Sequence, residues 1–152
     1  MNEYEHSQTV QAQADRVFDF ASNLNNLPEY LPTVRQAIVQ PGGRIRVQGE
    51  ANGQPYDSDG TFRIDKARRR MEWSADGNRQ YSGWLEVNED GRHASEVTVH
   101  LSFAVGPNDR RKLAQSTGSA DAAIMEGLQK SLQSLVNLIE GTGGKVEVRA
   151  AY

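Results

Sequence analysis

The chain has 152 residues, with 17 Lys and Arg against 20 Asp and Glu, and it contains no cysteine. This length favours a single domain, which we place at residues 1–141, followed by a tail or short edge strand at 142–152. The lack of cysteine excludes a disulfide scaffold, a thiolate metal site and a cysteine nucleophile.

Composition also narrows the class of protein. Leu, Ile, Val and Phe make up only about a fifth of the residues, but a net charge of −3 is too small to suggest a disordered chain. No apolar run is long enough to span a membrane, and the polar start does not resemble a signal peptide, so we expect a cytoplasmic protein. The mildly acidic pI gives no general attraction to nucleic acid.

The first third of the chain predicts one strand and one or two short helices. Residues 3–10 are typical of a strand, although an unusually polar one. Residues 14–22 place Val17, Phe18 and Ala21 at helical spacing. In the segment NLNNLPEYLPT that follows, Pro28 and Pro32 leave room for at most a short second helix.

Residues 33–105 predict a meander of about six antiparallel strands. Turn residues recur at short intervals, and such short connections require antiparallel neighbours. The clearest strand is ASEVTVHLSFAV, in which apolar residues alternate with polar ones. A long amphipathic helix follows near 119–140, with Ser119 as the expected N-cap and Gly141 as the expected end.

This order of elements resembles the START/Bet v 1-like (SRPBCC) superfamily, in its polyketide cyclase/dehydrase-like group. The segments that carry the resemblance are VQAQADRVFDF, LPEYLPTV, YSGWL and SEVTVHLSF, within roughly residues 2–141. The resemblance implies an α+β helix-grip fold, in which a curled antiparallel sheet of about six or seven strands wraps around the C-terminal helix. It also implies a cavity between the sheet and that helix.

Strand parity and the helical wheel select most of the residues that would line this cavity, and the family resemblance adds Tyr30 and Leu31 as a rim segment. The full set is Tyr4, His6, Gln8, Tyr30, Leu31, Tyr56, Ser58, Phe62, Met71, Trp73, Tyr81, Leu85, Val99, Leu101, Phe103, Asp121, Ile124 and Leu128. Gly60 and Gly83 share this inner face, where they favour a bend of the sheet or leave space for a ligand.

Polar residues on the inner face are the most informative departures from a plain core. Tyr4, His6 and Gln8 indicate either a wet end of the cavity or an exposed edge strand. His6 and Asp121 are catalytic candidates, since a histidine could transfer protons, but the sequence favours a solvated or structural role for both. Tyr30 and Leu31 fit either a cavity rim or a packed corner.

Several other signals carry no chemistry. His6, His93 and His100 lack metal-ligand spacing, so we expect no metal and no cofactor. The basic run at 68–70 is interpreted as a solvated turn. Trp84 has outer-face parity and could mark a partner surface.

Three functions remain open from the sequence. The first is binding of a small hydrophobic or amphipathic ligand, such as a lipid, a quinone or a polyketide-like molecule. The second is a cofactor-independent cyclase or dehydratase that uses His6, Tyr56, Tyr81 or Asp121 in the same cavity. The third is a ligand-free interaction module of the co-chaperone or ribosome-associated kind. No nucleic-acid partner is expected, and both a monomer and a homodimer are compatible with the sequence.

Overall fold

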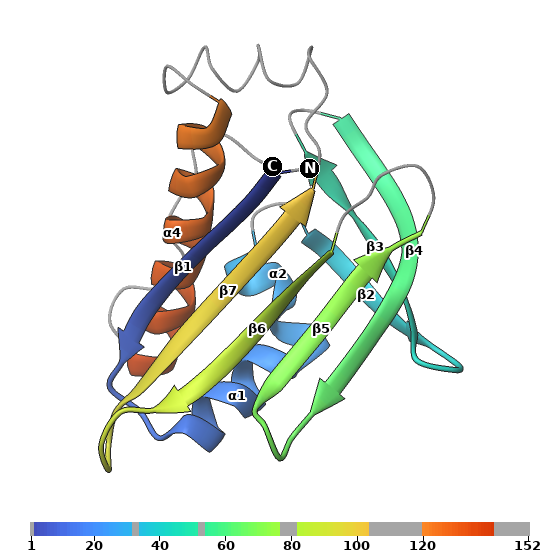
Figure 1. Ribbon diagram of the computed structural model, residues 1–152. Coiled ribbons are helices and arrows are strands. Elements are labelled where there is room, and N and C mark those ends of the chain that lie inside the picture. The colour runs from blue at the N-terminus through green and yellow to red at the C-terminus, as the bar shows by residue number, and fades with distance from the viewer. Residues whose placement is uncertain (1, 32–33, 52–53, 77–81, 104–119, 142–152) are drawn as a thin grey trace.

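A computed structural model gives the architecture of the chain, and it describes residues 2–31, 34–51, 54–76, 82–103 and 120–141 (Figure 1). The helical elements are α1 (Ala14–Ser22), the 3-10 helix η1 (Leu24–Asn26), α2 (Leu27–Tyr30) and α4 (Ala120–Glu140). The strands are β1 (Asn2–Val10), β2 (Val34–Gln40), β3 (Arg44–Ala51), β4 (Gln54–Asp65), β5 (Arg70–Ala75), β6 (Ser82–Glu89) and β7 (Ser95–Phe103).

The seven strands form one antiparallel sheet in the order β1-β7-β6-β5-β4-β3-β2. Only the β1–β7 pairing joins strands that are distant in sequence, and the remaining strands form a meander. The predicted strands and the α+β helix-grip fold are therefore confirmed. The sheet curls, and α4 stands beside β1 (Figure 1).

Helices cover one face of the sheet, which we call the inner face, and none of the described helices covers the opposite, outer face (Figure 1). α4 packs mainly along β1, whereas α1 contacts β6, β7 and α4. Both helices are amphipathic and turn their apolar stripes toward the sheet, as the sequence predicts. The main core includes the fully buried residues Phe18, Leu85, Ile124, Leu128, Leu132 and Leu135.

The turn chemistry agrees with the sequence where the structure describes it. Gly42, Gly43, Gly91 and Gly141 have φ angles of +75°, +73°, +85° and +74°, a region that favours glycine. Gly141 ends α4 as predicted. The predicted N-cap Ser119 and the predicted tail at 142–152 lie outside the described residues. None of the described helices is long and apolar enough to cross a membrane.

Candidate ligand-binding face

The predicted cavity residues gather in two rows that run across the strands on the inner face. One row joins Tyr4, Leu101, Gly83, Trp73 and Phe62 through direct cross-strand pairs. Strand alternation therefore assigns these side chains to one face, as the sequence predicted.

The second row joins His6, Val99, Leu85, Met71 and Ile64 in the same way. Val99, Leu85 and Met71, in the middle of the row, are buried, whereas His6 at one end is half-buried. Ile64 at the other end is 40% exposed. Burial therefore decreases from the central strands toward both ends of the row.

Apolar side chains on the inner face of β4 and β5 are incompletely covered. Phe62 and Trp73 are cross-strand partners, and both are only half-buried although they pack against the core. Ser58 lies four residues before Phe62 on β4, and its half-buried side chain is on the same face of the sheet. α4 packs mainly on β1, at the opposite side of the sheet. This part of the inner face therefore offers aromatic surface, with a polar group farther along β4.

Gly83 and Gly60 do not leave space for a ligand. A Cβ atom at Gly83 would lie 2.6 Å from Cζ2 of Trp73, because the indole ring covers this glycine. A Cβ atom at Gly60 would lie 3.2 Å from Cα of Ala75, and closer still to the carbonyl oxygen of Ser74. Both glycines therefore permit close packing, and the ligand-space interpretation is wrong at these two positions.

The polar inner face of β1 is explained mainly by its contacts with α4. The Gln8 side chain donates a hydrogen bond of 2.5 Å to Oε1 of Gln133, which in turn donates one of 2.7 Å to Asn137. At the end of α4, the backbone N–H of Gln11 donates to Glu140. β1 is also an edge strand. The strand is at an edge as predicted, but its inner face is covered by α4 and not exposed, and paired amides offset the cost of placing Gln8 under a helix.

Tyr30 belongs to a packed corner of the molecule. Its ring is 3% exposed, and its hydroxyl donates a hydrogen bond of 2.7 Å to the carbonyl oxygen of Ala21. Burial raises the pKa of the Tyr30 hydroxyl, so this group stays protonated and keeps donating. Leu31 beside it is half-buried against the core.

The remaining predicted residues divide into two groups. Ile124 and Leu128 lie buried on the sheet-facing side of α4, as predicted. The whole of Tyr81 and the side chains of Tyr56, Phe103 and Asp121 lie outside the described residues.

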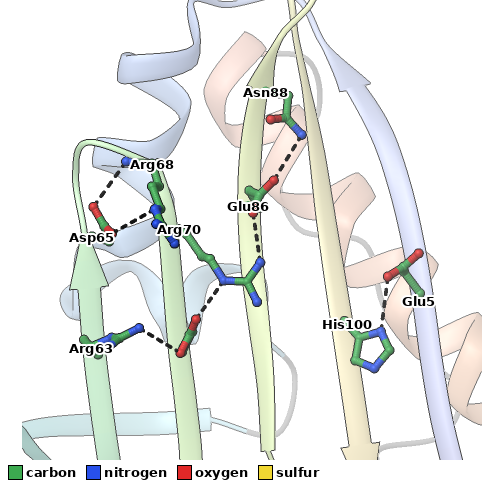
Figure 2. Close-up of polar contacts among 9 residues, drawn as sticks. Glu5, Arg63, Asp65, Arg68, Arg70, Glu86, Asn88 and His100 are labelled. Atoms are coloured by element: carbon green, nitrogen blue, oxygen red, sulfur yellow. Dashed lines mark hydrogen bonds and ion pairs between the residues drawn. The ribbon is translucent and has the colours of Figure 1, made fainter.

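On the outer face, Trp84 is covered by side chains from both neighbouring strands. The guanidinium carbon of Arg70 lies 4.3 Å from the Trp84 ring centroid, and the His100 ring stacks at 5.4 Å with an interplanar angle of 3°. Figure 2 shows Arg70 reaching Glu86 and His100 facing Glu5. The outer-face position of Trp84 is confirmed, but its ring is held in a polar network.

The basic run at the β4–β5 turn also differs from a plain solvated turn. Arg68 pairs with Asp65, and Arg70 pairs with Glu72 and Glu86. Arg69, with a φ of 52°, connects Asp15 at the start of α1 to Glu89 at the end of β6. The side chains of Arg69 and Arg70 are only 24% and 26% exposed. Arg69 and Arg70 therefore tie elements together, whereas Arg68 stays within the turn and is 78% exposed.

Two hollows formed by described residues open beside the outer face. The larger, of about 740 Å³, has Ser74, Ser82, Trp84 and His100 among its lining residues. The other, of about 630 Å³, lies beside Gln36 and Gln48 near the β2 edge, with lining residues Arg35, Gln36, Gln48, Gly49, Pro55 and Asp57. None of these lining residues belongs to α4, so the cavity between α4 and the sheet stays a prediction.

No metal site is formed by the described residues, among which no three His, Asp or Glu side chains converge suitably. His6 and His100 lie on opposite faces of the sheet, in agreement with their strand parity. His93 is exposed beside the 90–91 turn.

Comparisons with solved structures agree with this architecture. The chain is similar to the di-domain aromatase/cyclase BexL from the BE-7585A biosynthetic pathway, with 25% identity and a TM-score of 0.71 over 92% of this chain and 47% of that one. The chain thus spans about half the length of BexL. It is also similar to the ZhuI aromatase/cyclase from Streptomyces sp. R1128, with 16% identity and a TM-score of 0.66 over 94% and 98% of the two chains.

A third similar structure is a START superfamily protein from Mycobacterium smegmatis, with 14% identity and a TM-score of 0.67 over 90% and 98% of the two chains. The curated proteins with which the sequence was compared include no match. The family model described as "polyketide cyclase / dehydrase and lipid transport" matches residues 1–140, nearly the whole chain. Family membership supports, in general terms, a ligand-binding or cyclase role. The chain belongs to the polyketide cyclase/dehydrase and lipid transport family.

Proposed function

We propose that this protein binds a small hydrophobic or amphipathic molecule, such as a lipid, a quinone or a polyketide-like compound, between α4 and the inner face of the sheet. The observation that carries the proposal is the half-buried aromatic pair Phe62 and Trp73 on the inner face of the sheet. The lack of cysteine in the sequence fits action in the reducing cytoplasm, which we include in the proposal.

The chemistry of this surface suits an amphipathic ligand. Small-molecule sites are mainly apolar and aromatic, with a few polar groups that fix the orientation of the ligand. Phe62 and Trp73 supply aromatic area, while the Trp73 indole N–H and the Ser58 hydroxyl are possible hydrogen-bond partners. A bound molecule would remove the remaining exposed apolar area from water, which is favourable.

The proposal is tested first by extraction of the purified protein and mass spectrometry of any organic molecules recovered. In parallel, 8-anilinonaphthalene-1-sulfonate and palmitate serve as amphipathic probes in fluorescence and thermal-shift titrations. We expect saturable binding of at least one probe. Failure of both probes to bind, together with an extract free of organic molecules, would contradict the proposal.

Two neighbouring residues of β4 provide a matched pair of variants. Phe62 faces inward and Thr61 faces outward, because successive side chains alternate between the faces. We expect Phe62→Ala to weaken probe binding by roughly tenfold or more, the effect of losing an aromatic contact surface worth about 1.5–3 kcal/mol. Thr61→Ala should leave binding unchanged. Equal effects of the two substitutions would place the probe elsewhere.

A second candidate is ring closure of a linear polyketone, and the likeness to the BexL aromatase/cyclase favours it. His6 is half-buried on the inner face of β1, within the same cross-strand row as Met71. A neutral imidazole there could remove a proton from a carbon between two carbonyl groups, and the resulting carbanion would attack a third carbonyl before water is lost. Tyr56, Tyr81 and Asp121 stay predicted participants.

The cyclase candidate is tested with a linear polyketone thioester mimic, by following the appearance of an aromatic absorbance and the loss of water by mass spectrometry. His6→Gln should abolish conversion of the polyketone mimic, while the variant should still bind the fluorescent probe. If the wild-type protein binds the mimic without converting it, then the protein is a binding protein for this class of molecule, and the cyclase candidate fails.

A further inference from the structure

The two edges of the sheet differ in how they are protected against pairing with another strand. At the β1 edge, the strand carries the exposed carboxylates of Glu3 and Glu5, and α4 packs along it. Charged side chains and covering elements are the usual means by which proteins block an open sheet edge. The β2 edge is the other end of the sheet.

The regular part of β2 lacks such charges, although α2 and η1 contact this strand in the described part of the chain. An irregularity in the β2–β3 register lies between Val34 and Gln36, so that regular pairing runs over residues 36–40, and Pro41 follows. These five residues, QAIVQ, contain no charged side chain. Arg35, which is paired with Glu50, lies just outside this segment.

Exposed apolar side chains are concentrated on this short segment. Ile38 is 38% exposed and Val39 is 71% exposed, and together they are two of the three exposed large hydrophobic residues in the described part of the chain. Ile38 pairs with Arg46 and Val39 with Ile45, so the two side chains lie on opposite faces of the sheet. An uncharged edge with apolar residues on both faces is suited to accept another strand.

The segment QAIVQ has the same order of polar and apolar side chains when it is read from either end. Consider a second copy of this strand placed antiparallel to the first, with the two-fold axis at Ile38. Ile38 is then opposite its own copy, Ala37 is opposite Val39, and Gln36 is opposite Gln40. Each directly opposite pair then joins side chains of the same character, which stabilises cross-strand pairing. No like charges face one another within the five residues.

We propose that β2 pairs antiparallel with β2 of a second copy of this chain, so that two seven-stranded sheets join into one continuous sheet across a two-fold axis. The contact is isologous, and it therefore closes at two copies instead of growing into a fibre. Such an interface is small, which predicts a weak, concentration-dependent dimer. This inference does not depend on the proposed ligand.

The lack of cysteine makes single-cysteine variants a clean test of the predicted register. Directly opposite Cα atoms in an antiparallel pair lie about 4.5–5.5 Å apart, within the range that a disulfide can bridge. The two Val39 positions would be diagonal neighbours, about 7–8 Å apart, which is beyond that range. We therefore expect Ile38→Cys to form a covalent dimer under mild oxidation, and Val39→Cys to do so far more slowly.

Ile64→Cys is the matched control, because Ile64 is an isoleucine of nearly equal exposure on the interior strand β4. Exposure alone predicts the opposite order, with Val39→Cys reacting fastest. Circular dichroism of each variant shows whether its fold is retained. If Val39→Cys or Ile64→Cys cross-links as fast as Ile38→Cys, the proposed register is overturned.

Sedimentation velocity of the full wild-type chain, from about 10 to about 500 µM, gives an independent measurement of the weak dimer. We expect reversible dimerisation that Ile38→Lys abolishes and Ile64→Lys leaves unchanged. A wild-type chain that stays monomeric over this concentration range overturns the proposal. The β2 edge would then be open to a strand of another protein.

Discussion

Replacing Gly60 with alanine tests whether close approach of two strands, and not ligand space, explains this glycine. The added Cβ atom would lie 3.2 Å from Cα of Ala75 and from the carbonyl carbon of Ser74, and closer to the Ser74 oxygen. All of these are backbone atoms of the paired strand β5, so no side-chain rotation can relieve the overlap. The strands must move apart, and such overpacking costs about 3 kcal/mol.

For a chain of this size, that loss corresponds to a fall in Tm of about 6–12 °C. Urea unfolding followed by tryptophan fluorescence gives the change in free energy directly. Gly91→Ala is the control, because no heavy atom lies within 4 Å of its added Cβ, and only its φ of +85° opposes alanine. That strain costs about 1 kcal/mol.

The reasoning is refuted if Gly60→Ala costs no more than Gly91→Ala. A Gly60→Ala protein of normal stability that has lost probe binding would show that the glycine makes room for a ligand instead.

Three further predictions concern polar contacts. Gln8→Ala leaves the amide of Gln133 without one of its partners and should cost about 1 kcal/mol in urea unfolding, whereas Gln8→Leu combined with Gln133→Leu should recover much of that loss. Tyr30→Phe should destabilise the protein by about 1–2 kcal/mol, because a buried carbonyl of α1 loses its donor, but should not change probe binding if this residue is a packed corner. The hydrogen bond from Arg46 lowers the pKa of Asp57 from 3.8 to about 2. Because the folded-state value is depressed, the stabilisation from this carboxylate is complete well above pH 3.8 and disappears as the pH falls from about 4 to about 2. Side-chain NMR titration of Asp57 in the wild type and in Arg46→Gln checks this, and an unchanged midpoint in the variant would count against it.

Local sequence patterns were sufficient for the strands, the helices and the meander because each element carries its own periodicity, whereas the helix-grip arrangement was implied by the family resemblance. Alternation along 95–103 assigns Val97, Val99 and Leu101 to the inner face and His100 to the outer face, as found. The same rule placed Trp84 on the outer face. The order of elements, with short connections, then left an antiparallel meander as the simplest topology.

The details of the candidate site depend on contacts that no local pattern contains. Gln8 bonds to Gln133, 125 residues away, and this pairing depends on where α4 docks on the sheet. Parity assigns Gly83 and Trp73 to one face but does not reveal that the indole ring covers the glycine. Likewise, no sequence pattern indicates that the Tyr30 hydroxyl donates a hydrogen bond to the carbonyl oxygen of Ala21 in α1.

The measurement closest to the central claim is a titration with 8-anilinonaphthalene-1-sulfonate of two variants that each keep one tryptophan. Trp84→Phe leaves Trp73 on the inner face, and Trp73→Phe leaves Trp84 on the outer face. Energy transfer to the bound probe depends steeply on distance. The proposed inner-face site predicts saturable quenching that is stronger from Trp73 than from Trp84. Stronger quenching of Trp84, or no saturable quenching in either variant, would contradict ligand binding between α4 and the sheet.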